Sequence, residues 1–335
     1  MTAGIAGARS LWFVEPRRVE LRSGPLPTPG DGDVVVRTTF SGISAGTEML
    51  AYRGELDAEL AVDETIGALC GTFRYPFRYG YSCVGVVEES RGGVAVGTRV
   101  FSFQPHQDRF VVGDTDVVPL GAVDDRAATM FPLVETALQI SLDAGAVFGQ
   151  RVVVYGLGAV GALTCLVLQR AGAHVVAVEP RSSRRDLLTR LGVRCVAPAA
   201  VGEALAENGE PARVPLVIEA SGNPDVLRSV LPLLSHEGTA LVASWYGTKE
   251  VALPLGAEFH RRRLTLRSTQ VSTIPAGLAD RWNPARRRRA VVGLMDSLPL
   301  ADLATHTYAF DEAPAAYAAV DAGEEGLIHA ALGYG

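Results

Sequence analysis

Three glycines in the stretch VVVYGLGAVG have the spacing G-x-G-x-x-G, at Gly156, Gly158 and Gly161. A valine-rich run precedes them and an apolar run with helical spacing follows, and in this context the spacing predicts a strand, a tight turn and a helix. The first glycine permits the turn, the second lets a pyrophosphate approach the backbone, and the third lets helix and strand pack closely. The N–H groups at the helix start, where Ala159 and Val160 lie, then favour a diphosphate. The stretch predicts a dinucleotide site; the alternative is a glycine-rich turn that binds no nucleotide.

An acidic residue, Glu179, ends the next predicted strand, eighteen positions after Gly161. A carboxylate at this place can accept hydrogen bonds from the adenosine ribose and would repel a 2′-phosphate, which favours NAD. Arg181, Arg184 and Arg185 follow directly and could instead hold a 2′-phosphate, so NADP stays an alternative.

Length and composition limit the class of protein. The chain has 335 residues, about half of them apolar, which predicts two globular domains. Its net charge of −6 gives no support for a nucleic-acid or anionic membrane partner, and the basic runs 260–267 and 285–290 are interpreted as solvated faces. The four cysteines form no C-x-x-C pair, which argues against a structural zinc site and against a disulfide framework. No signal-like segment and no apolar run long enough for a membrane helix is evident, so we expect a cytoplasmic protein.

The first 125 residues contain short valine-rich runs separated by turn residues, and these predict strands at 33–44, 82–90, 97–103 and 108–120. Helical spacing then begins, and a helix is expected over 125–146 with Asp125 as its cap.

Strand and helix patterns alternate in the middle of the chain. Strands are expected at 151–156, 174–180, 214–222 and 239–245, and helices at 159–172, 182–192 (with a serine cap) and 223–238. After residue 270 the patterns predict helices at 286–298 and 310–323 and a last strand at 327–334. Such alternation indicates an α/β fold with a doubly wound parallel sheet of the Rossmann type, placed at 129–270. The β-rich domain would comprise 1–128 and 271–335.

This organisation resembles the medium-chain dehydrogenase/reductase superfamily, whose members combine a GroES-like catalytic domain with a Rossmann domain. The resemblance covers nearly the whole chain and includes GTRVF, VIEASGNP, LTLRSTQVS and the terminal stretch THTYAFDEAPAAYAAVDAGEEGLIHAAL. The stretches SGISAGTE, QPHQDRF and LVETALQ are most similar to the branch that includes bacteriochlorophyllide a 2-hydroxyethyl dehydrogenase.

Two motifs depart from the zinc-dependent members of the superfamily. Those members carry G-x-C-G-S/T-D, and here SGISAGTE places Ser44 at the cysteine position. They also carry G-H-E-x-x-G, and here GYSCVG places Tyr81 at the histidine and Ser82 at the glutamate. Serine hydroxyls and a neutral tyrosine are poor zinc ligands. The resemblance therefore implies a zinc-independent member, with no metal site.

Without a metal, a side chain must polarise the substrate oxygen or relay its proton. His106, in a proline-containing loop after a strand, is the first candidate because its pKa range suits proton exchange near neutrality. Tyr81 is the second, since by resemblance it stands where a zinc ligand would face the nicotinamide. Glu48 and Glu135 are the third, either orienting His106 or binding substrate hydroxyls. The alternatives are a surface histidine, a tyrosine that fills volume and structural ion pairs.

Further residues are assigned by the resemblance. Substrate contacts are expected from Ser44, Thr47, Thr136 and Trp245. Cofactor contacts outside the glycine loop are expected from Glu179, Arg181, Arg184, Ser221, Gly222, Tyr246, Gln270 and His329, the last matching a position where relatives carry a basic group for the pyrophosphate.

The expected function is a metal-free, NAD(P)-dependent interconversion of a secondary alcohol and a ketone on a polar or natural-product substrate. One alternative is an NADPH-dependent reductase of C=C bonds in enones or quinones, and another is a catalytically silent nucleotide-binding protein. The resemblance also implies a homodimer formed through the region 239–270.

Overall fold

The computed structural model describes residues 7–206 and 212–335 and divides the chain into two compact units. The first comprises 1–132 and 292–335, and the second comprises 133–291. The sequence placed these boundaries at residues 128 and 270. No helix in the described part of the chain has the length and apolar character needed to cross a membrane.

The first unit is built on antiparallel strands. A seven-stranded sheet has the order β14-β15-β3-β4-β5-β7, with β6 also paired to β3, and a separate hairpin joins β1 to β2. The strands are β1 (Ala8–Glu15), β2 (Arg18–Gly24), β3 (Asp33–Ile43), β4 (Cys83–Ser90), β5 (Arg99–Ser102), β6 (Arg109–Gly113), β7 (Val117–Pro119), β14 (His306–Ala309) and β15 (Ala330–Gly333). The helices are α1 (Thr47–Arg53), α2 (Asp125–Ala128), α9 (Leu300–Leu303) and α10 (Ala313–Ala322).

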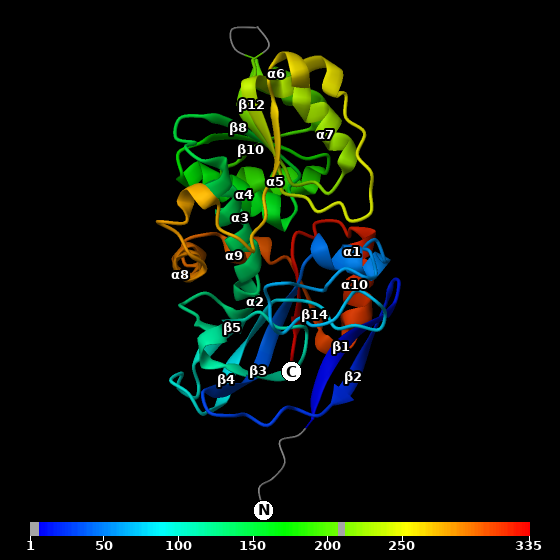
Figure 1. Cartoon of the computed structure of the whole chain (residues 1–335), viewed down its shortest axis with the longest axis vertical. Coiled ribbons are helices and arrows are strands. Elements are labelled where there is room, and N and C mark those ends of the chain that lie inside the picture. The colour runs from blue at the N-terminus through cyan, green and yellow to red at the C-terminus, as the bar shows by residue number, and fades with distance from the viewer. Residues whose placement is uncertain (1–6, 207–211) are drawn as a thin grey trace, which may run out of the picture. The chain divides into compact units, whose positions relative to one another are not determined.

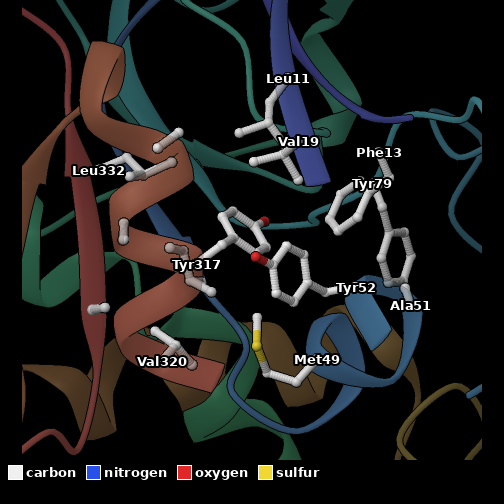
Figure 2. Close-up of a cluster of buried hydrophobic side chains, with 14 of the residues drawn as sticks. Leu11, Phe13, Val19, Met49, Ala51, Tyr52, Tyr79, Tyr317, Val320 and Leu332 are labelled. Atoms are coloured by element: carbon white, nitrogen blue, oxygen red, sulfur yellow. The ribbon is translucent and has the colours of Figure 1, made fainter. Parts of the chain in front are cut away.

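An aromatic core fills the space between the hairpin, α1 and α10 (Figure 2). Tyr317 reaches from α10 into this core, where its ring packs edge-on against Phe13 with the centroids 5.4 Å apart. Phe13 in turn stacks on Phe77 at 5.2 Å. Aromatic pairs in these arrangements add to the free energy gained from burial, so the core fixes α1 and α10 relative to each other.

The second unit is a six-stranded parallel sheet with the order β10-β9-β8-β11-β12-β13 (Figure 1). The strands are β8 (Arg151–Tyr155), β9 (His174–Val178), β10 (Arg194–Val196), β11 (Val214–Glu219), β12 (Leu234–Val242) and β13 (Thr265–Ser268). The helices are α3 (Phe131–Ala144), α4 (Ala159–Arg170), α5 (Ser182–Arg190), α6 (Val201–Leu205), α7 (Pro224–Val230) and α8 (Pro284–Met295). The expected doubly wound α/β fold is confirmed, and strand order reverses next to β8, where such sheets bind ligands.

Several local predictions were wrong. The helix expected over 125–146 is two helices, α2 and α3, and its cap is Asp124, whose side chain accepts the Ala127 N–H at 3.0 Å. Asp125 instead pairs with Arg99. The helix expected over 223–238 ends at Val230, because residues 234–242 enter the sheet as β12.

Other differences lie in caps and short elements. The predicted serine cap of α5 is wrong, since Arg181 is the N-cap residue and makes no side-chain cap. The strand expected over 108–120 is two strands, β6 and β7, separated by one helical turn. The hairpin β1–β2, strand β10 and helix α6 had no counterpart in the sequence-based pattern.

Candidate active site

The glycine loop joins β8 to α4 in the second unit. Gly156 has a φ of +89°, and a Cβ on it would lie 2.6 Å from the Ser221 Cα. A Cβ on Gly161 would lie 1.9 Å from the carbonyl oxygen of Gly156. These distances are too short for any side chain, so both positions require glycine. The loop thus has the tight turn and the close helix–strand packing that the sequence predicted for Gly156 and Gly161, and the approach of a pyrophosphate at Gly158 stays a prediction.

Glu179 lies just past the end of β9 and holds this loop in place. Its buried carboxylate accepts the Leu157 N–H at 2.8 Å through Oε2 and the Arg181 N–H at 3.0 Å through Oε1. Each carboxylate oxygen has further lone pairs, so a ribose hydroxyl can still be accepted. The carboxylate therefore both shapes the loop and remains able to bind a ribose.

Positive charge lies beside the same loop. Arg185 Nη1 donates to the carbonyl oxygens of Glu179 at 2.8 Å and Pro180 at 2.7 Å. The Arg184 guanidinium lies next to Gly158, since a Cβ built there would be 4.0 Å from its Nη1. Arginine at this position favours an anionic ligand such as a phosphate.

A second buried carboxylate, Glu219, was not identified from the sequence. It ends β11 and accepts the Ser221 N–H at 2.6 Å and the Tyr246 hydroxyl at 2.6 Å. The neighbouring Gly222 N–H donates to the Ser244 hydroxyl at 2.8 Å. Ser221, Gly222 and Tyr246, all predicted from the resemblance, are thus held together around Glu219. The signal in the sequence was a single acidic residue at the end of an apolar strand.

Two predicted contact residues of this unit face solvent. Trp245 is 44 % exposed. Gln270 is exposed as well, and its Oε1 accepts the Ser272 N–H and the Ser272 hydroxyl. Their predicted contacts with substrate and cofactor stay predictions.

In the first unit, a buried pair joins Glu48 of α1 to His106. Glu48 Oε2 lies 2.9 Å from His106 Nε2 and also accepts the Tyr317 hydroxyl, while Oε1 accepts the Ser44 N–H at 2.8 Å. His106 Nδ1 lies 2.6 Å from the Ser41 hydroxyl, which lies 2.8 Å from the Tyr334 hydroxyl. Both ring nitrogens of His106 therefore have protein partners.

Gly80 of the GYSCVG stretch has a φ of +94°, and His106 lies directly against it. A Cβ on Gly80 would be 2.4 Å from the His106 Cδ2. Neither His106 nor Glu48 has any exposed side-chain surface. The structure therefore brings these two predicted residues together, and it seals His106 from solvent rather than leaving it on a loop surface.

Tyr81 is the half-exposed member of this region. Burial and the nearby Glu48 charge raise the pKa of Tyr81 to about 12, although hydrogen bonds with Ser44 and Thr47 oppose the rise. The phenol is therefore protonated at pH 7 and can donate. Ser82, which stands at the glutamate position of the zinc motif, donates instead to the Thr129 carbonyl oxygen at 2.6 Å.

The side chains in this region do not form a zinc site. Among the described residues, no three His, Cys, Asp or Glu side chains are grouped so that they could hold a metal ion. The nearest candidates, Glu48 and His106, are engaged with each other and with Tyr317 and Ser41. A tetrahedral site needs three or four converging ligands, so this donor set does not fit zinc.

Glu135 and Thr136 lie on α3, and Glu135 belongs to a different cluster. Its buried carboxylate pairs with the buried Arg287 of α8, with Oε1 3.0 Å from Nε. Arg287 Nη1 also donates to the Gln139 Oε1 at 2.6 Å. The buried carboxylate therefore has the charged partner that burial requires.

His329 precedes β15 and is buried. Thr129 donates its hydroxyl proton to the Arg126 carbonyl oxygen at 2.6 Å, so its Oγ1 must accept from His329 Nε2, 2.9 Å away. Burial and the Arg126 charge lower the pKa of His329 to about 4. The ring is neutral at pH 7. It does not carry the charge expected of a basic pyrophosphate ligand, and any contact with the cofactor stays a prediction.

Replacing Gly161 with alanine tests the loop geometry. The new Cβ would overlap the Gly156 carbonyl oxygen, so the loop must move, and we expect the affinity for a nicotinamide dinucleotide to fall at least ~10-fold in a fluorescence titration. Gly202→Ala in α6 is the control, since nothing lies within 4 Å of its Cβ. Wild-type affinity in Gly161→Ala would show that the close approach is not needed.

The buried pair on α3 and α8 predicts a stability effect. Arg287→Met leaves the buried Glu135 carboxylate with only the more distant Arg288 Nε, 4.0 Å from Oε1, and should lower the free energy of unfolding in urea by about 3 kcal/mol. Arg289→Met, at an exposed position of the same helix, should change it by less than about 0.5 kcal/mol. Equal effects of the two variants would contradict this account.

His329 predicts a pH effect on stability. Its folded pKa of about 4 lies below the unfolded value of 6.5, so its contribution is complete above pH 6.5 and is lost as the pH falls towards 4. The loss amounts to about 3 kcal/mol. Unfolding at several pH values should therefore show a shallower dependence between pH 4 and 6.5 in His329→Gln than in wild type. His236→Gln, which removes an exposed histidine, should keep the wild-type slope.

Comparison with known proteins finds similarity to dehydrogenases. The family described as zinc-binding dehydrogenase matches residues 159–288. The chain is 28% identical over 329 residues to the 2-desacetyl-2-hydroxyethyl bacteriochlorophyllide A dehydrogenase of Cereibacter sphaeroides, covering 90% of this chain and 91% of that one. It is 26% identical over 277 residues to the D-guloside 3-dehydrogenase of Escherichia coli K-12, covering 76% and 78%.

The same fold is found among solved structures. The L-idonate 5-dehydrogenase of Escherichia coli K-12 superposes with a TM-score of 0.79 at 15% identity, covering 98% of each chain. The chain therefore has the fold of the medium-chain dehydrogenase/reductase superfamily, and its residues 159–288 match the zinc-binding dehydrogenase family.

Proposed function

We propose that this protein is a nicotinamide-dependent oxidoreductase that interconverts a secondary alcohol and a ketone, and that side chains rather than zinc act on the substrate oxygen. The observation that carries the proposal is the glycine loop, where Gly156 and Gly161 leave no room for side chains and Glu179 accepts the Leu157 N–H. This arrangement suits a dinucleotide at the carboxyl edge of a parallel sheet.

The residues that would hold the cofactor are those of the second unit. The N–H groups at the start of α4 can bind the pyrophosphate, and Glu179 can accept from the adenosine ribose. When bound, the nicotinamide accepts or donates a hydride. We propose NAD as the cofactor because Glu179 places negative charge near the 2′ position, while Arg184 beside Gly158 makes NADP the competitor to measure.

The residue we assign to the substrate oxygen is Tyr81. Its pKa of about 12 keeps the hydroxyl protonated, so in ketone reduction it can donate a proton to the oxygen that gains negative charge. The neighbouring Ser44 and Thr47 side chains lower the pKa of this phenol and so partly oppose the effect of burial. His106 was the first candidate from the sequence, but its ring is fully buried and both nitrogens are engaged, so we assign it, with Glu48, to positioning.

The absence of zinc from the reaction is part of the proposal and is supported by residue chemistry. By resemblance, Ser44 and Tyr81 stand where zinc-dependent relatives carry ligands, and the nearby Glu48 and His106 are engaged in hydrogen bonds within the protein. Hydroxyl groups of ordinary pKa are weak ligands for zinc compared with imidazole and thiolate.

Similarity supports the substrate class. The two similar proteins reported above are named as dehydrogenases of a guloside and of a hydroxyethyl-bearing bacteriochlorophyllide. We propose a polar secondary alcohol as substrate. We also propose a homodimer, since all four residues of the sheet-edge strand β13 are exposed in the described chain and could pair with a second copy.

Tyr81→Phe tests the assignment by removing only the hydroxyl. We expect kcat for ketone reduction to fall about 100-fold while the affinity for the cofactor is kept, because the glycine loop is untouched. Tyr308→Phe is the matched control, since Tyr308 lies on β14 and loses only a hydroxyl that donates to Glu324 at 2.9 Å. Steady-state kinetics over a panel of ketones, secondary alcohols and enones, with NADH and NADPH, gives the measurement.

The purified wild-type enzyme also tests whether the reaction needs zinc. Purified active enzyme should contain far less than one zinc per chain and keep its activity after chelation. Stoichiometric zinc with loss of activity on chelation would contradict the proposal, as would full activity of Tyr81→Phe. Activity on enones alone would favour reduction of C=C bonds.

A further inference from the structure

Glu219 is a buried carboxylate at the carboxyl end of β11. It has no exposed surface, and donors surround it on both oxygens. Oε1 accepts the Ser221 N–H at 2.6 Å and the Ser221 hydroxyl at 2.5 Å, and Oε2 accepts the Tyr246 hydroxyl at 2.6 Å. Tyr246 follows β12, the next strand of the sheet. The carboxylate therefore ties together the ends of two neighbouring strands.

Glu219 and Glu179 lie on opposite sides of β8, Glu219 as the last residue of β11 and Glu179 one residue past the end of β9. Tyr155, the last residue of β8, pairs with Val178 of β9 and with Glu219 of β11. Each carboxylate accepts the N–H two residues further along through Oε1, from Arg181 at 3.0 Å and from Ser221 at 2.6 Å. Each then uses Oε2 for a donor from a neighbouring segment. The two glutamates thus lie on either side of β8, the strand that leads into the glycine loop.

The strand order assigns a different half of the ligand to each glutamate. A doubly wound sheet of this order binds a dinucleotide across the point where the order reverses, with one mononucleotide on each half of the sheet. The acidic residue after the glycine loop, Glu179, lies on the adenosine half. Glu219 and Tyr246 lie on the other half, where the nicotinamide mononucleotide would bind.

We propose that Glu219 is a positioning residue for the nicotinamide half of the cofactor, because it fixes the Tyr246 hydroxyl as a hydrogen-bond acceptor. A phenol has one proton, and here that proton is given to Glu219. The remaining lone pairs of the half-buried Tyr246 can accept only from a donor group, such as the carboxamide NH₂ or a ribose hydroxyl of the nicotinamide mononucleotide. This inference rests on the proposed function, since it assumes a nicotinamide dinucleotide.

The surrounding chemistry keeps Tyr246 in this state. Burial and the hydrogen bond to Glu219 raise the pKa of Tyr246 well above 10, so the proton stays on the phenol at neutral pH. Tyr246 therefore does not switch to donating towards the ligand as long as Glu219 is a carboxylate.

Glu219→Gln should reverse the direction of the hydrogen bond between Tyr246 and residue 219. The backbone N–H of Ser221 can only donate, so the glutamine Oε1 must face Ser221 and its NH₂ must face Tyr246. Tyr246 then accepts from the glutamine and points its proton towards the ligand. A donor on the cofactor would meet another donor, which is costly when both are shielded from water.

The test compares the whole cofactor with a fragment that lacks nicotinamide. In Glu219→Gln we expect the affinity for NADH, or for NADPH if wild type prefers it, to fall about 10-fold. The affinity for ADP-ribose should stay within twofold of wild type, because the glycine loop and Glu179 are unchanged. Tyr246→Phe removes the acceptor altogether and should lower the affinity for NADH about 3-fold or more. The affinity for ADP-ribose should again be unaffected. In Tyr246→Phe, the further change Glu219→Gln should add little. Glu203→Gln, at an exposed glutamate of α6, is the control.

The outcomes separate the two proposals. If Glu219→Gln lowers the affinities for ADP-ribose and for NADH equally, the residue supports the whole site and the positioning role is wrong. Unchanged NADH affinity in both Glu219→Gln and Tyr246→Phe overturns it as well. If Glu219→Gln does not fold, Tyr246→Phe alone decides. If wild type binds neither NADH nor NADPH, the proposed function itself fails.

Discussion

A carboxylate taken out of water must be surrounded by donors, and this constraint shapes every part of the candidate site. Four glutamates are buried in the described chain, namely Glu48, Glu135, Glu179 and Glu219. Each takes at least one donor from a segment that is distant in the sequence, and so each ties elements together. Glu179 holds the glycine loop through Leu157, and Glu219 joins the end of β11 to Tyr246. Glu135 joins α3 to α8, and Glu48 joins α1 to α10 and His106.

The parts that the sequence predicts well depend on local spacing. The glycine loop needs three residues within six positions, and alternation of strands and helices is visible in short windows, so the doubly wound sheet and its switch point follow directly. Glu179 follows from the same motif. Helix ends were less predictable, since β12 begins inside an apolar run that would also suit a helix, and only pairing with β11 decides between the two.

The parts that could not be predicted depend on contacts far apart in the chain. The position of His106 in a proline-containing loop suggested an accessible base, but Gly80, Ser41 and Glu48 enclose it. Glu219 has no sequence motif because its decisive partner, Tyr246, lies beyond the end of another strand, β12. Neutral His329 could not be foreseen either, since its low pKa comes from burial and from Arg126 rather than from its neighbours in sequence.

Three tyrosines near these carboxylates differ in which group accepts the hydroxyl proton, and this difference gives each of them a different role. Tyr317 gives its proton to Glu48 and is fully buried, so it belongs to the core. Tyr246 gives its proton to Glu219 but is half-exposed, so it can only accept from a ligand. Tyr81 has hydroxyl neighbours, Ser44 and Thr47, that can either donate or accept, and its proton is therefore not committed to a carboxylate. Among the three, only Tyr81 combines exposure with a transferable proton, which is the physical reason for assigning the substrate oxygen to it.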